Sequence, residues 1–257
     1  MTDSRRVPLQ ALLIILCTWL MASCATPGIS GLQYRAPMRA HPVTTETVVR
    51  LPVSETWALL LEQLRLHAFD IKKVEKASRL IHVSFSTDRP EHYVDCGIIH
   101  RTFQYEKESE TYTYPVTSSS SFKVATQWGK PAALPVVGTY DRDTSLEARI
   151  TVFVAPKKKH TTVTVHTRYT FISRVSGQQD YMNAAGIVVK SRQISEQQST
   201  IAFETGKIGS AIWNGPPHSF EVTCHPTGLL EAEILAMANG HHAGVDSREV
   251  LPSRTSS

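Results

Sequence analysis

The chain has four cysteines, whose side chains have the widest choice of chemistry. A cysteine can be acylated, can form a disulfide or can bind a metal as its thiolate. Cys17 and Cys24 lie inside and just after an apolar run near the start of the chain, whereas Cys96 and Cys224 lie far apart in the remainder. The chemistry open to each therefore depends on whether the apolar run is an export signal or a membrane span.

The N-terminal segment has the charge and length pattern of a secretory signal. Arg5 and Arg6 precede an apolar run over residues 11–21, and two small residues follow it. The run is too short for a spanning helix, which needs about 20 apolar residues. The order of charged, apolar and small segments predicts that residues 1–23 are a cleaved signal peptide.

The string "LMASC" resembles the bacterial lipobox, in which an aliphatic residue and two small residues precede a cysteine that is acylated and becomes N-terminal. The resemblance implies that Cys24 carries the lipid and anchors the protein permanently, because each buried methylene contributes about 0.8 kcal/mol. The alternative is a plain signal peptide with Cys24 unmodified. Ala25 stands where Asp would resemble the inner-membrane retention signal of enteric bacteria. We therefore expect a lipid-anchored protein on the periplasmic face of the outer membrane.

Export leaves Cys96 and Cys224 as the two thiols of the folded part. In an oxidising periplasm, two thiols are most simply a disulfide. The bridge would close a loop of more than a hundred residues, for which the chain-entropy model gives roughly 4–5 kcal/mol of stabilisation. A free buried pair is the alternative. A metal site is disfavoured because neither cysteine lies in a C-x-x-C motif, although His225 adjoins Cys224.

The chain lacks the short motifs of common enzymes. It contains no H-E-x-x-H, no G-x-S-x-G and no phosphate-binding loop. Ser120 and Lys123 match S-x-x-K, but they lie in a serine-rich stretch without the other elements of that acylase pattern. Asp95, beside Cys96, is typical of a turn or strand end. The histidines toward the C-terminus have no carboxylates at ligand spacing; they are His218, His225, His241 and His242. We therefore predict no enzymatic activity, no catalytic residues, no metal and no cofactor.

The charge of the chain disfavours nucleic acid as a partner. The formal net charge is +4, and removal of residues 1–23 lowers it to +3, because Arg5, Arg6 and Asp3 leave. Lys157 to Lys159 form the basic cluster "PKKKH" with His160. The cluster is typical of a solvated hairpin tip, and contact with anionic lipid or cell-wall polymer is the alternative.

Apolar spacing predicts the elements of one domain over residues 44–240. A strand over 44–51 precedes a helix that Ser54 caps and that buries a stripe of Trp57, Leu60, Leu61 and Leu64. Period-two alternation in 145–155 and 161–172 predicts an antiparallel hairpin. Residues 227–239 predict a closing helix.

The rest of the chain shows weaker periodicity. Residues 24–43 are rich in Gly, Pro and Ala and predict a lipidated flexible tether. Residues 106–143 include a serine run and predict a long, poorly packed insertion between strands. Residues 181–198 predict a helix or loop, and residues 241–257 a disordered tail. The element order indicates an α+β fold, an antiparallel sheet with helices packed on one face.

The span "VVRLPVSETWALLLEQLRLHAFDIKKVEKASRLIHVSF" resembles the repeated unit of BamC-type lipoproteins of the outer-membrane β-barrel assembly machinery. The shared pattern is a strand, a helix with an early Trp, a turn and a strand pair, over residues 45–86. The resemblance implies a helix-grip fold, in which a curved antiparallel sheet grips a helix.

Two functions follow as expectations. The first is a non-enzymatic envelope adaptor, anchored in the membrane by its lipid, that binds envelope proteins, such as the β-barrel assembly machinery, or peptidoglycan. The second is a small-molecule or lipid carrier that uses a cavity between helix and sheet.

Overall fold

The computed structural model describes residues 28–38, 42–67, 69–127, 135–183, 185–213 and 219–240. The predicted signal peptide, the predicted lipidation site Cys24 and the predicted C-terminal tail lie outside these ranges. Within them the chain is a β-rich α+β fold of antiparallel sheets with two α-helices. Neither of these helices is long and apolar enough to cross a membrane.

The elements follow one another from β1 to α3 along the chain. The strands are β1 (Ile29–Arg35), β2 (Glu46–Val49), β3 (Asp70–Glu75), β4 (Leu80–Thr87), β5 (Val94–Asp95), β6 (Ile98–Tyr105), β7 (Glu108–Pro115), β8 (Ser120–Gln127), β9 (Pro135–Lys157), β10 (His160–Met182), β11 (Val188–Glu204), β12 (Gly209–Trp213) and β13 (Phe220–Pro226). The helices are α2 (Val53–Leu66) and α3 (Leu229–Ala238), with a short 3-10 turn η1 (Pro90–His92).

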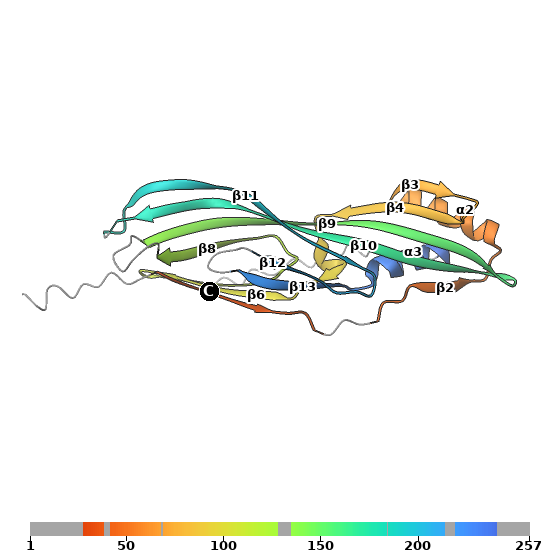
Figure 1. Ribbon diagram of the computed structural model, residues 1–257, viewed down its shortest axis with the longest axis horizontal. Coiled ribbons are helices and arrows are strands. Elements are labelled where there is room, and N and C mark those ends of the chain that lie inside the picture. The colour runs from red at the N-terminus through yellow and green to blue at the C-terminus, as the bar shows by residue number, and fades with distance from the viewer. Residues whose placement is uncertain are drawn as a thin grey trace, which may run out of the picture.

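The predicted hairpin is confirmed, and it is the longest feature of the molecule. β9 and β10 pair antiparallel from the tip next to Lys157 and His160 as far as Val136 and Tyr181, and they run along the whole length of the molecule (Figure 1). The even-numbered side chains of β9 from Leu146 to Val154 are buried, as the alternation predicts. The hairpin is longer than expected because the same alternation of burial continues back to Val136.

One end of the hairpin carries the helices. In the described residues the main sheet has the order β11-β10-β9-β4-β3, with β2 paired to β10. α2 and α3 contact each other and pack on β9 and β10 at the end where β2, β3 and β4 lie (Figure 1). α2 buries Leu60 and Leu64 and half-buries Trp57. The predicted N-cap is wrong: the helix begins at Val53, so Pro52 is the N-cap and Ser54 lies inside the first turn. Pro52 suits this position because an N-cap residue has an extended backbone, which Pro readily adopts.

The other end is built of strands alone. Sheets β1-β6-β7 and β12-β13-β5 face the half of the main sheet formed by β8, β9, β10 and β11 (Figure 1). The tether prediction is wrong for residues 29–35, which pair with β6 along their whole length. Only Leu32 of β1 is buried, so no apolar period marks the strand. Instead, the Tyr34 hydroxyl fastens β1 to the backbone of Cys96 and Thr223.

The predicted insertion over 106–143 is also wrong, because β7, β8 and the start of β9 are regular paired strands. Hydrogen bonds fix the turn between β7 and β8. The Thr144 hydroxyl donates to the carbonyl of Thr117 at 2.6 Å, and the Thr144 N–H donates to the hydroxyl of Ser119 at 3.0 Å.

Residues 188–198 belong to strand β11, which runs to Glu204, instead of forming the predicted helix or loop. Most side chains between Val188 and Gln198 are exposed on both faces, so the segment has neither a helical nor a period-two pattern. Pairing with β10 determines its conformation.

Helix α3 carries a partly buried carboxylate whose ionisation should weaken the fold. Within the described part of the chain, Glu233 Oε1 has no hydrogen-bond partner. Burial raises the pKa of Glu233, although Tyr93 and His67 oppose the shift. The folded state therefore holds this proton more tightly than the unfolded chain, so stability falls as pH rises above the ordinary Glu range.

Substitution Glu233→Gln should remove this cost. We expect a melting temperature about 2–4 °C above that of the wild type at pH 7, and no difference at pH 4, measured by thermal unfolding. A gain that is equal at both pH values would contradict the ionisation argument.

Candidate functional site

A cavity of about 190 Å³ lies between the sheets at the strand-only end. Side chains from β6, β8, β9, β10, β11, β12 and β13 line it. It is larger than the engineered apolar cavity of about 150 Å³ that binds benzene. All three sheets therefore contribute to one internal space, on the part of the hairpin away from the helices.

Two buried arginines form the basic wall of this cavity. Arg101 on β6 is 5% exposed and Arg142 on β9 is 3% exposed. The Arg101 Nε donates to the Tyr114 hydroxyl at 2.7 Å, and its guanidinium lies 4.0 Å from the centre of the Phe122 ring. The Arg142 guanidinium lies 4.7 Å from the centre of the Tyr114 ring. Both arginines therefore contact the same tyrosine.

Arg142 keeps its charge with little compensation. One terminal nitrogen donates to the carbonyls of Pro115 and Ser118, while Nε has no hydrogen-bond partner among the residues that the structure describes. Among the described residues, no carboxylate lies within 4 Å of this guanidinium. Burial lowers the pKa of Arg142 to about 10; Tyr114 opposes the shift and the charge of Arg101 adds to it. The group is still a cation at neutral pH.

Two further donors in the cavity lining lack partners within the described ranges. They are the Ser173 hydroxyl on β10, 1% exposed, and the Trp213 indole N–H on β12, 7% exposed. Buried donors are nearly always satisfied in folded proteins, and exceptions point to an unseen water, ion or ligand. Together with Arg142 Nε, the lining thus presents three unpaired buried donors.

The remaining lining residues give the cavity an apolar interior and a polar rim. The apolar side chains include Ile99, Phe122 and Val175. At the rim, the Gln179 amide donates to the Tyr140 hydroxyl at 2.9 Å, and Gln197 on β11 is exposed. The exposed position of Gln197 indicates that the cavity opens toward β11.

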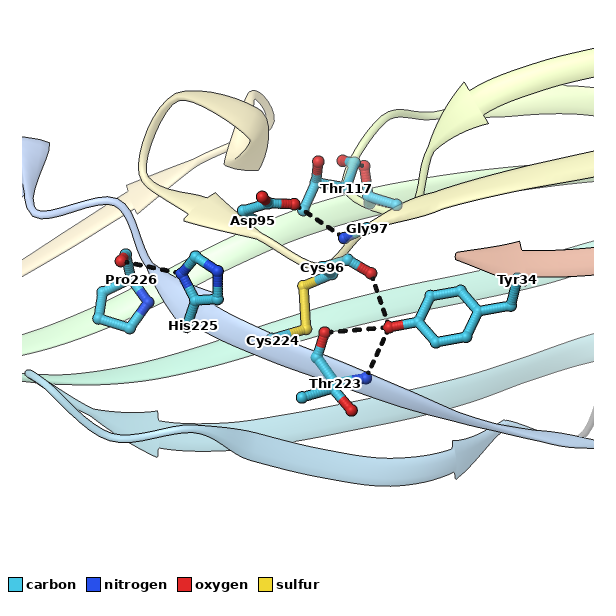
Figure 2. Close-up of a disulfide and its surroundings, with 10 residues drawn as sticks. Tyr34, Asp95, Cys96, Gly97, Thr117, Thr223, Cys224, His225 and Pro226 are labelled. Atoms are coloured by element: carbon cyan, nitrogen blue, oxygen red, sulfur yellow. Dashed lines mark hydrogen bonds between the residues drawn. A yellow bond between two sulfur atoms is a disulfide. The ribbon is translucent and has the colours of Figure 1, made fainter. Parts of the chain in front are cut away.

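The predicted cysteine pair forms a disulfide between Cys96 and Cys224 (Figure 2). Cys96 lies between β5 and β6, and Cys224 lies on β13, so the bridge joins two sheets. In the same view the Tyr34 hydroxyl, from β1, contacts the backbone on both sides of the bridge (Figure 2). The bridge is therefore part of the framework that holds the strands lining the cavity.

The other residues that sequence analysis considered are placed apart from the cavity. Asp95 accepts a hydrogen bond from the Gly97 N–H at 2.8 Å, which is a turn contact. His225 bonds the carbonyl of Met38 at 3.0 Å. Lys123 pairs with Glu108 and Glu110. His218, His241 and His242 lie outside the described residues.

Sequence analysis missed the arginines, although one signal could have found Arg142. Its even number puts it in phase with the buried side chains of β9 from Leu146 to Val154. A charged residue in the apolar phase of a strand is a candidate for a binding site. The cavity has to be interpreted from its own chemistry, because no protein-family model, curated protein or solved structure matches this chain.

Proposed function

We propose that this protein is a non-enzymatic, lipid-anchored binding protein of the bacterial cell envelope that holds a small organic ligand in the cavity. The observation that supports it is the cavity lining, where Arg142, Ser173 and Trp213 present buried donors without partners. Concave, mostly apolar spaces with a few convergent polar groups are the usual form of ligand sites. The site lies between sheets, rather than between helix and sheet as the carrier expectation had it.

The lipid anchor is part of the same proposal, and the lipobox resemblance at Cys24 supports it. If Cys24 carries the lipid, the start of β1 at Ile29 follows it by five positions. That separation spans less than about 20 Å at full stretch. The domain would then stay close to the periplasmic face of the outer membrane.

The relationship to BamC-type lipoproteins is part of the proposal as well. It is supported by the end of the molecule where α2 and α3 pack on β9 and β10. We assign a helix-grip arrangement to this end alone. The strand-only end with the cavity is additional to it.

An exposed sheet edge favours a second function, that of an adaptor for envelope proteins such as the β-barrel assembly machinery, or for peptidoglycan. Within the described residues β11 is the edge of the main sheet, and its first two residues, Val188 and Val189, are 47% and 56% exposed. Open edges can accept an added strand from a partner.

Purification of the full-length protein from its native envelope in mild detergent separates the two functions. Native mass spectrometry that finds a small molecule bound to the chain would support the binding protein. Stoichiometric envelope proteins without such a molecule would support the adaptor instead.

Filling the cavity should abolish ligand retention. Ser199 lies in the lining on β11, and the neighbouring Gln198 is exposed and points to the opposite face. We expect Ser199→Trp to lose the co-purified molecule, because the indole occupies its space, and Gln198→Trp to keep it. Equal retention in both variants, measured by native mass spectrometry, would place the ligand elsewhere.

A further inference from the structure

We infer that the cavity binds an organic anion: a compact carboxylate, sulfonate or phosphate group at Arg142 and Arg101, carried on a single ring or a short apolar body. This inference rests on the proposed function and names the class of its ligand. The charge and the contacts of the two arginines and the volume of the cavity support it.

The buried charge of Arg142, which is 3% exposed, favours an anionic ligand. Its described partners are two carbonyl oxygens and the rings of Tyr114 and Trp213. These groups are neutral, and burying a charge is costly unless it is paired. The unpartnered Nε gives a bound anion a charge-assisted hydrogen bond. An anionic ligand would therefore satisfy both the charge and the open donor.

Arg101 strengthens the preference for an anion. It lies against the same Tyr114 that Arg142 contacts, and its positive charge repels that of Arg142. Two like charges in a poorly solvated site repel each other. No Asp or Glu is among the described residues that line the cavity. An anion held near both guanidinium groups would offset this repulsion, whereas a cation would increase it.

The lining and the volume of the cavity determine the size and the apolar character of the rest of the ligand. Phe122, Val175 and Phe220 offer apolar surface next to the arginines, and the Trp213 N–H and Ser173 hydroxyl add donors. A space of about 190 Å³ holds little more than one ring with its substituents, by comparison with the benzene-binding cavity of about 150 Å³. It has no room for the acyl chains of a lipid. The ligand class is therefore a small soluble organic anion.

Matched probes test the charge of the ligand. Benzenesulfonate and benzenesulfonamide share one ring and nearly the same size, but only the sulfonate is an anion at pH 7. We expect the full-length protein to bind the sulfonate roughly tenfold to a hundredfold more tightly, as one or two charge-assisted hydrogen bonds allow. Isothermal titration calorimetry and ligand-detected NMR measure both affinities.

Two arginine variants locate the site. Arg142→Met removes the buried charge, whereas Arg149→Met removes the same charge from the exposed face of the same strand. We expect Arg142→Met to lose the preference for the sulfonate while it keeps the sulfonamide affinity. Arg149→Met should behave as the wild type does. Loss of the preference in both variants would mean that long-range charge, not the cavity, selects the anion.

The outcomes distinguish the inference from the function on which it rests. If the wild type binds both probes equally, the anion inference fails and the cavity remains a ligand site. If it binds neither probe, and no molecule co-purifies, both fail. The comparison of the two probes on the wild type tests the anion inference even if Arg142→Met does not fold, because it needs no variant.

Discussion

Replacing Cys96 and Cys224 together by alanine is expected to lower the free energy of unfolding by about 5 kcal/mol. The two cysteines are separated by 128 positions in the sequence, and the chain-entropy model gives about that value for a loop of this length. Both sulfur atoms belong to side chains that are fully buried. Alanine is therefore a better replacement than serine, because it adds no buried hydroxyl.

Loss of the disulfide should also affect the cavity, because Cys224 lies on β13. Cys224 pairs with Gly209 of β12, and these two strands carry Phe220 and Trp213 of the cavity lining. Loss of the bridge should therefore loosen this wall and weaken benzenesulfonate binding before the chain unfolds.

Urea unfolding of the protein measures the effect. Dithiothreitol should reproduce the double variant's midpoint in the wild type and should leave that of the variant unchanged. A loss below about 1 kcal/mol would show that native packing, rather than the bridge, holds the two sheets together.

Sequence patterns predicted those parts of the fold where one face of an element is buried. The alternation from Leu146 to Val154 and the stripe through Leu60 and Leu64 have a clear period, since each places apolar groups against one core. The disulfide was predictable because the expected export would leave two thiols in the folded chain. These signals are local in the sequence or depend on composition alone.

The remaining strands depend on pairing with distant segments. β1 buries only Leu32, and β11 is mostly exposed on both faces as far as Gln198, so neither segment has a period to detect. The cavity was hidden for a related reason. Arg142 lies in a segment whose serine and threonine residues indicated a loop, and its partners at Pro115 and Ser118 are fixed only once β7, β8 and β9 are paired.

Removal of the Glu231 side chain should give the second largest loss of stability. Glu231 lies in the first turn of α3 and is fully buried. Its oxygens accept hydrogen bonds from the Tyr169 hydroxyl at 2.8 and 2.7 Å and from the Thr205 hydroxyl at 2.7 Å. This cluster joins α3 to β10 and to the end of β11, so it fastens the helical end to the long hairpin.

Glu231→Ala is expected to cost about 2–4 kcal/mol, from a cavity and from the Tyr169 hydroxyl left without an acceptor. Glu231→Gln should cost less than about 1 kcal/mol. Its amide oxygen can accept from Tyr169 and its amide N–H can donate to Thr205, while the buried charge is removed. Urea unfolding measures both variants. Equal losses would show that the negative charge itself, not the hydrogen bonds, stabilises the cluster.

A double-mutant cycle measures the interaction between Tyr169 and Glu231. It uses Tyr169→Phe, Glu231→Ala and the variant that combines them. If the hydrogen bond dominates, the combined loss should be well below the sum of the single losses, because either substitution alone breaks the bond. β9 and β10 pass through both ends of the molecule, so unfolding should remain one cooperative transition. A separate early transition of the helical end in Glu231→Ala would instead show that the hairpin does not couple the helices to the cavity.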